Sequence, residues 1–131
     1  MKFSHSFRIQ KDDIDEHQHV NNVAYLRWIQ DVAVAHWQAA ASAEQQKKYT
    51  WFVIRHEIDY KKRAFLGEEI IATTWVGEAA KVRCERFTQI LRGETVLVEA
   101  KSIWCLLETE TGKPSRINEE LRAIFRMSGR G

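Results

Sequence analysis

The chain has 131 residues, of which 44% are hydrophobic and 29% are charged, and we expect it to form one domain, residues 1–131, with a packed core. Its net charge of +2 gives no reason to expect a nucleic acid or a membrane as a partner, and no apolar run approaches the roughly 20 residues of a membrane span. The first residues lack the apolar stretch of a signal peptide, so we expect a cytoplasmic location.

The first part of the chain predicts a strand, a polar loop and a long helix. The strand is expected over residues 2–11 and the loop over residues 12–20. Nothing in residues 22–46 ends a helix, and apolar side chains recur there at spacings of three and four. Because further apolar side chains occupy its other faces, we expect this helix to be buried nearly all round. Asn21 or Asn22 is a suitable N-cap.

The second part predicts four strands and a short helix. The strands are expected over residues 51–62, 69–76, 81–91 and 95–107, and the helix over residues 118–125. The first strand has a period of two through Phe52, Ile54, His56, Ile58 and Tyr60. Gly77 is expected to mark a turn. Short connections predict that these four strands are antiparallel neighbours, with the long helix packed on one face of their sheet.

A group of polar side chains stands directly before the long helix: Asp15, His17, His19, Asn21 and Asn22. A helix N-terminus offers unpaired backbone N–H groups and partial positive charge, which can polarise a carbonyl group. A carboxylate, imidazoles and such N–H groups within so few residues predict an acyl-transfer site.

This order of elements outlines the α+β hot-dog fold, in which a five-stranded antiparallel sheet wraps a long central helix. The segment Asp15-Glu-His-Gln-His-Val-Asn-Asn-Val-Ala-Tyr-Leu-Arg-Trp28 resembles the signature of the 4-hydroxybenzoyl-CoA thioesterase-like acyl-CoA thioesterases. Part of it is shared with the long-chain acyl-CoA thioesterase branch and with the plant acyl-ACP thioesterases. The segment Asp59-Tyr-Lys-Lys-Arg-Ala-Phe-Leu-Gly-Glu-Glu69 is similar to the second conserved segment of the family.

The resemblance implies roles for three residues in thioester hydrolysis. Asp15 takes the position of the catalytic carboxylate, as nucleophile or as general base. The backbone N–H that polarises the carbonyl is assigned to Asn22. His19 takes the position of a functional histidine in the plant enzymes, where it either orients the loop or protonates the leaving thiolate. His17 stands where those enzymes have a functional asparagine, and Arg63 stands where they have a glutamate.

The same resemblance implies how the substrate is bound. The acyl chain is expected beside the helix, and the coenzyme phosphates beside a basic segment. The expected substrate-binding residues are His17, Asn21, Tyr25, Trp28, Lys61, Lys62 and Arg63. No metal or redox cofactor is expected, because His17 and His19 have no obvious third ligand nearby. The expected partners are an acyl-CoA substrate and further copies of the chain, as a homodimer or homotetramer with the site at the subunit interface.

Two other functions remain open at this point. A hot-dog hydratase or dehydratase acts on acyl thioesters through a histidine and an acid that face each other across the pocket. A non-catalytic acyl-CoA binding domain keeps the pocket but has no need of the polar loop. Asp15 and the helix N-terminus favour hydrolysis over both alternatives.

Overall fold

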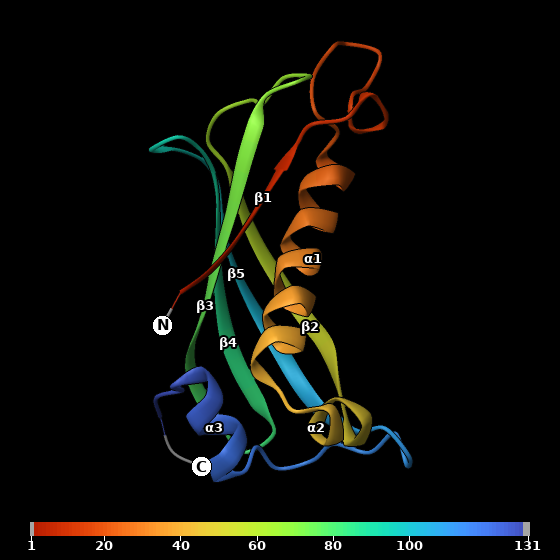
Figure 1. Cartoon of the computed structure of the whole chain (residues 1–131), viewed down its shortest axis with the longest axis vertical. Helices are drawn as coiled ribbons and strands as arrows, with labels where there is room; N and C mark the ends of the chain where they lie inside the picture. Colours follow the sequence, from red (N-terminus) through yellow and green to blue (C-terminus); the bar gives the residue numbers. More distant parts are fainter. Residues whose placement is uncertain (1, 130–131) are drawn as a thin grey trace.

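The structure, a computed structural model, describes residues 2–129. A curved antiparallel sheet wraps around one long helix, and two short helices lie at one end of the molecule (Figure 1). In chain order the elements are β1 (Phe3–Arg8), the 3-10 helix η1 (Lys11–Asp13), α1 (Asn22–Ala40), α2 (Ala43–Lys48), β2 (Tyr49–Tyr60), β3 (Glu69–Ala80), β4 (Arg83–Arg92), β5 (Thr95–Glu108) and α3 (Glu119–Phe125). The predicted hot-dog architecture is confirmed. No helix of the described residues is long and apolar enough to cross a membrane.

The strand order is β1-β3-β4-β5-β2, and every neighbouring pair is antiparallel. The prediction that β2 lies beside β3 is therefore wrong, because β2 pairs with β5 and forms an edge of the sheet. Two-residue turns join β3 to β4 and β4 to β5, whereas residues 61–68 carry the chain from β2 to β3. This longer segment crosses the end of the sheet, where the N–H groups of Lys61 and Lys62 both donate to the Leu97 carbonyl.

The predicted long helix is divided into two. α1 ends at Ala40, and α2 begins at Ala43 with Ser42 as its N-cap. Ser42 Oγ accepts the Gln45 N–H at 3.1 Å, while Gln45 Oε1 accepts the Ser42 N–H at 2.9 Å. This reciprocal capping box stabilises a new helix start where apolar periodicity alone gives no sign of one.

One face of α1 packs on the concave side of the sheet and supplies much of the core. Tyr25, Trp28 and Ile29 pack with residues of β3, β4 and β5 near the N-terminus of the helix. A second cluster, which includes Leu121 and Phe125 of α3, lies near its C-terminus. The helix is not buried all round, because Val23 is 67% and Val34 48% exposed. Its two ends therefore lie against two separate parts of the core.

β2 presents different faces along its length. The register shifts between Val53 and Arg55, so Ile54 has no pairing partner on β5. Before this bulge the odd-numbered Trp51 and Val53 are partly buried, and after it the even-numbered His56 and Ile58 are. The uninterrupted alternation expected from the sequence is therefore wrong, because an extra residue in one strand moves the following side chains to the opposite face.

Gly77 does not mark a turn but lies inside β3, which continues to Ala80. A Cβ at this position would come within 2.6 Å of Phe87 Cε2 on β4. The register of the two strands shifts between Val76 and Ala79. A glycine inside a strand is typical of such an irregularity, where another side chain lies close to the backbone.

Candidate active site

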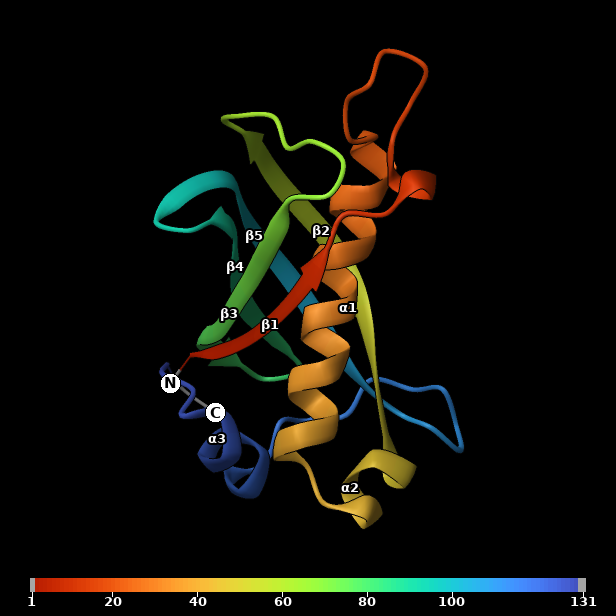
Figure 2. The same cartoon turned by 45° about the horizontal axis from the view of Figure 1, so that its top comes forward.

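A cavity of about 460 Å³ lies at the N-terminus of α1. It is enclosed by the loop before the helix and by the segment after β2, which lie beside each other at one end of the molecule (Figure 2). All the predicted site residues except His17 and Trp28 line this cavity: Asp15, His19, Asn21, Asn22, Tyr25, Lys61, Lys62 and Arg63. Val20 and Tyr60, which the sequence did not single out, line it as well.

The two carboxylate oxygens of Asp15 have different surroundings. Oδ1 accepts the backbone N–H groups of His17 at 2.9 Å and His19 at 3.2 Å. The hydrogen bond from His19 is the main reason why the pKa of Asp15 lies below its ordinary value, so the carboxylate is ionised at neutral pH. Oδ2 accepts no hydrogen bond from residues 2–129. One oxygen therefore holds the loop, and the other remains available to a water molecule or a substrate.

The loop that carries Asp15 is a closed turn. Ile14 and Val20 form an antiparallel bridge across its base, and the Asp15 N–H donates to the His19 carbonyl at 2.8 Å. Gln18 adopts a left-handed conformation with φ of 67° at its tip. The Asp15 side chain closes the same turn from inside, which is the capping role that an acidic loop residue often has. The capping role and a catalytic role are compatible, because they use different oxygens.

Asp13 anchors this loop to α1 and was not identified from the sequence. Its side chain is buried, accepts the Gln10 N–H at 2.8 Å through Oδ2, and pairs with Arg27 of α1 through Oδ1. Its backbone carbonyl accepts the Asn21 N–H at 2.9 Å. Asp13 precedes Arg27 by fourteen residues, and no helix or strand periodicity predicts that residues this far apart pair with each other.

The first turn of α1 leaves one backbone donor free. Asn21 is the N-cap, and its Oδ1 accepts the Val23 N–H at 2.9 Å while its carbonyl accepts the Ala24 N–H at 2.9 Å. Among residues 2–129, the Asn22 N–H donates no hydrogen bond. This unpaired N–H carries the partial positive charge of a helix N-terminus and belongs to a residue that lines the cavity.

His19 is held by Arg63 from the opposite wall of the cavity. Arg63 Nη1 lies 2.9 Å from His19 Nε2. A guanidinium group can only donate, so Nε2 is the acceptor and the imidazole proton is assigned to Nδ1. In this arrangement His19 is neutral, and Nε2 has no proton to give to a leaving group.

Three consecutive basic residues of the segment after β2 line the cavity. Lys61, Lys62 and Arg63 are all exposed, and the only carboxylate near Lys61 Nζ among the described residues is that of Glu99, at 3.5 Å. Arg92 of β4 binds the connection between β2 and β3, because its Nη1 donates to the Arg63 carbonyl and to the Glu68 carboxylate. The rim therefore presents three positive charges on a backbone that is tied to the sheet.

The remaining predicted residues lie around this arrangement. The Tyr25 hydroxyl accepts the Ala64 N–H at 3.1 Å, and burial raises the pKa of Tyr25 above its ordinary value. Trp28 is only 5% exposed and packs against Phe7 and Tyr25 in the core, away from the cavity lining. His17 points outward, with Nε2 3.6 Å from Glu16 Oε1.

Comparisons with known proteins place this geometry in context. A family model described as the acyl-ACP thioesterase N-terminal domain matches residues 1–125. An uncharacterized protein of Mycobacterium tuberculosis is 27% identical over 123 residues, which are 94% of this chain and 48% of that protein. The chloroplastic palmitoyl-acyl carrier protein thioesterase of Gossypium hirsutum is 27% identical over 131 residues, which cover 92% of this chain and 32% of that protein. The chain thus spans about half or less of these curated relatives.

A solved structure shares the fold of the chain. A hypothetical protein from Staphylococcus aureus in complex with CoA superposes with a TM-score of 0.84 at 16% sequence identity. The superposition covers 96% of this chain and 82% of that one. At this identity the likeness shows the fold alone.

Proposed function

We propose, because the chain belongs to the acyl-ACP thioesterase family, that it hydrolyses an acyl thioester to a free carboxylic acid and a thiol. The observation that carries this proposal is the cavity at the N-terminus of α1. It is lined both by a carboxylate with one unoccupied oxygen, on Asp15, and by Asn22, whose backbone N–H is unpaired. These are the two groups that hydrolysis of a thioester requires.

The reaction divides between these two groups. The Asn22 N–H donates to the carbonyl oxygen of the thioester and stabilises the negative charge that develops there. Asp15 Oδ2 either takes a proton from a water molecule that attacks the carbonyl carbon, or attacks that carbon itself. In both routes the C–S bond breaks and the thiolate leaves. In the second route water then hydrolyses the acyl-Asp15 anhydride and restores the carboxylate.

Coenzyme A is the proposed carrier of the acyl group. The exposed Lys61, Lys62 and Arg63 at the mouth suit the phosphates of the coenzyme, and the Staphylococcus aureus neighbour was solved with CoA. The Gossypium hirsutum relative is named a palmitoyl-acyl carrier protein thioesterase, so an acyl carrier protein is the alternative carrier. Rates measured with one acyl group on both carriers decide between them, and the proposal expects the higher kcat/KM with coenzyme A.

A homodimer joined along β2 is the proposed assembly. β2 is an edge strand of twelve residues with exposed Phe52 and Ile54, and the exposed Val34 of α1 adds a further apolar side chain. An unprotected edge of this kind is suited to pairing with a second copy. Tyr60, the last residue of β2, lines the cavity, so such pairing brings the partner close to the site. Sedimentation of the wild-type chain should give the mass of a dimer or a dimer of dimers.

Release of free thiol from a panel of acyl-CoAs tests the reaction. The Asp15→Asn variant should lower kcat by at least about 10², which corresponds to about 2.7 kcal/mol of barrier. Its matched control is Asp12→Asn, because Asp12 is an exposed carboxylate of the same region and does not line the cavity. If Asp15→Asn stays within a few-fold of wild type, Asp15 has no part in the mechanism. If wild type binds acyl-CoA but releases no thiol, the chain is a binding domain.

A further inference from the structure

The turn at residues 65–68 presents two large apolar side chains to solvent. Phe65 is 46% exposed and Leu66 is 54% exposed. The turn comes shortly after residues 61–63, the basic segment that lines the cavity at the N-terminus of α1. Exposed apolar side chains that lie next to a cavity are candidates for contact with a ligand.

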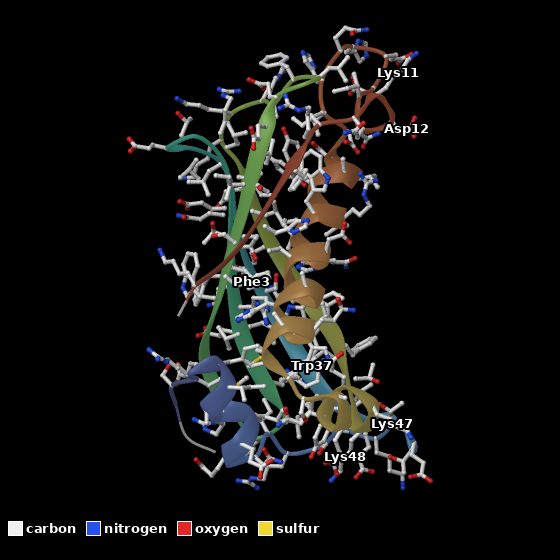
Figure 3. The ribbon with its side chains drawn as sticks, in the orientation of Figure 1. Phe3, Lys11, Asp12, Trp37, Lys47 and Lys48 are labelled. Atoms are coloured by element: carbon white, nitrogen blue, oxygen red, sulfur yellow. The ribbon has the colours of Figure 1, made fainter. Side chains whose placement is uncertain are left out.

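This turn lies at the same end of the molecule as the loop before α1. The Ile9 N–H donates to the Glu68 carbonyl at 3.0 Å, and the Gly67 N–H donates to the Ile9 carbonyl at 3.2 Å. Ile9 stands two residues before Lys11, which Figure 3 labels at one end of the molecule, far from Trp37. The exposed pair therefore belongs to the end that carries this cavity.

Hydrogen bonds fix the conformation of the turn. The Phe65 N–H donates to Glu68 Oε1 at 2.7 Å, and the Glu68 N–H donates to the Phe65 carbonyl at 3.2 Å. Gly67 has a φ of 82°, in the left-handed region that favours glycine. Arg92 Nη1 donates to the Glu68 carboxylate at 3.0 Å, and Arg8 Nη1 donates to the Gly67 carbonyl at 2.6 Å. A ligand that binds here meets a surface that is already ordered, which lowers the entropic cost of binding.

Phe65, His19 and Arg63 form one continuous surface. The rings of Phe65 and His19 meet edge to face with their centroids 6.4 Å apart, and Arg63 Nη1 donates to His19 Nε2 at 2.9 Å. The neighbouring Lys62 is exposed and forms no salt bridge with any residue in the described part of the chain. An open aromatic ring beside such cations suits a nucleotide, because the base stacks on the ring and the phosphates pair with the cations.

We propose that Phe65 binds the adenine ring of coenzyme A by stacking, while Lys62 and Arg63 bind its phosphates. This inference rests on the proposed function, in which coenzyme A carries the acyl group. Only the nucleotide part of the coenzyme gains from the contact, since the pantetheine arm has no aromatic base. Phe65 is thereby a specificity-determining residue that favours coenzyme A over a carrier without a nucleobase.

Calorimetric titration with adenosine 3′,5′-bisphosphate, the nucleotide part of coenzyme A, tests binding without any reaction. Phe65→Leu keeps an apolar side chain but removes the aromatic face, so it should weaken binding at least about fivefold. Phe65→Tyr keeps the ring and should bind with wild-type affinity. The matched control is Leu66→Ala, because Leu66 is exposed on the same turn, and its affinity should also equal that of wild type. Equal affinities of Phe65→Leu and wild type, or no measurable binding by wild type, would overturn the proposal.

Kinetics with two substrates locate the effect in the nucleotide. One acyl group is presented on coenzyme A and on 4′-phosphopantetheine, which has the arm and a phosphate but no base. Phe65→Leu should lower the ratio of kcat/KM for the two substrates at least about fivefold, because only the coenzyme loses a contact. The change should come from a higher KM for acyl-CoA with kcat retained, as expected when binding common to ground state and transition state is removed. An unchanged ratio would contradict the assignment.

The outcomes separate this proposal from the proposed function. If wild type binds adenosine 3′,5′-bisphosphate through Phe65 but releases no thiol from acyl-CoA, the nucleotide site stands and hydrolysis fails. If wild type hydrolyses acyl-CoA and Phe65→Leu changes neither the nucleotide affinity nor the substrate ratio, hydrolysis stands and the nucleotide site fails. If Phe65→Leu instead lowers the sedimenting mass of the chain while nucleotide affinity stays unchanged, the turn is a contact between copies and the proposal is wrong.

Discussion

Arg63 Nη1 donates to His19 Nε2 over 2.9 Å, and this contact joins the segment after β2 to the loop before α1. This hydrogen bond connects the two walls of the cavity at the N-terminus of α1. Because Nε2 accepts this hydrogen bond, the imidazole proton is on Nδ1 and the ring is neutral. His19 is accordingly suited to orienting the loop and unsuited, in this arrangement, to protonating a leaving thiolate.

Substitution of His19 distinguishes orientation from acid catalysis. His19→Ala should lower kcat/KM by less than about 10², which is the lower limit for loss of a general acid, and should leave the shape of the pH profile unchanged. Arg63→Met should have an effect of similar size, and the double variant should be no worse than either single one. Lys62→Met serves as a control for loss of charge at the rim. If the pH profile of His19→Ala lacks one limb of the wild-type profile, His19 acts as a general acid.

The backbone donor of Asn22 can be removed without disturbing the helix. Proline is favoured at the first position of a helix, and Asn21, with φ of −67° and ψ of 139°, has the extended conformation that a residue before proline requires. Asn22→Pro should fold normally and lose about 10²–10³ in kcat, the usual effect of deleting an oxyanion donor.

The matched control is Asn22→Ala, which keeps the N–H and should retain activity within a few-fold of wild type. Thermal unfolding of both variants, followed by circular dichroism, verifies that the helix is intact. Equal losses in the two variants would mean that the side chain matters and that the backbone account is wrong.

Asp13 is predicted to act as a positioning residue. Asp13→Asn removes the charge that pairs with Arg27 and weakens the bond from the Gln10 N–H, so the free energy of unfolding should fall by about 1–3 kcal/mol. Because the loop then holds Asp15 less firmly, kcat should fall more than KM rises. Arg27→Met should reproduce both effects, and the two changes should be non-additive. Asp31→Asn, on the exposed side of α1, should alter neither quantity.

The buried His36 predicts a loss of stability in mild acid. Burial first, and the Arg86 charge second, lower the pKa of His36 from 6.5 to about 4 in the folded chain. Between these values the unfolded chain binds a proton that the folded chain does not. The contribution of His36 to the free energy of unfolding is therefore complete above pH 6.5 and is lost as the pH drops toward 4. The contribution should be roughly 1–3 kcal/mol, and urea unfolding at several pH values measures it.

His36→Asn keeps an acceptor for Arg86 and cannot titrate. The difference in unfolding free energy between pH 7 and pH 4 should therefore be smaller in this variant than in wild type. His5→Asn, at an exposed histidine of β1, should keep the wild-type difference. A pH dependence identical in all three proteins would mean that His36 titrates normally in the folded chain.

The sequence predicted those features that depend on local chemistry. Amphipathic periodicity and the Asn21 cap placed the start of α1, and most of the residues singled out before it line one cavity. The second segment, Lys61 to Arg63, came to the same cavity because residues 61–68 cross the end of the sheet beside the start of the helix. That crossing was not predicted, since the pairing of β2 with β5 depends on contacts between residues far apart in sequence.

Features set by side-chain packing or by single extra residues escaped prediction. The break between α1 and α2 depends on a capping box of Ser42 and Gln45, and the face of β2 depends on one bulge. Trp28 was expected beside the substrate, yet helical spacing alone cannot distinguish a core side chain from one that lines a cavity. Asp13 and Arg86 act through partners on other elements, so neither had a local signature.

The bulge at Ile54 makes the first half of β2 sensitive to the length of the chain. Deletion of that single residue would rotate Thr50 and Phe52 toward α1 and turn Trp51 and Val53 outward. Trp51 would then leave Trp37, whose ring it meets edge to face with the centroids 5.8 Å apart. Both tryptophans line a cavity of about 290 Å³ near the C-terminal end of α1. A one-codon deletion far from the loop before α1 would thus change the packing of two tryptophans and the outer edge of the sheet together.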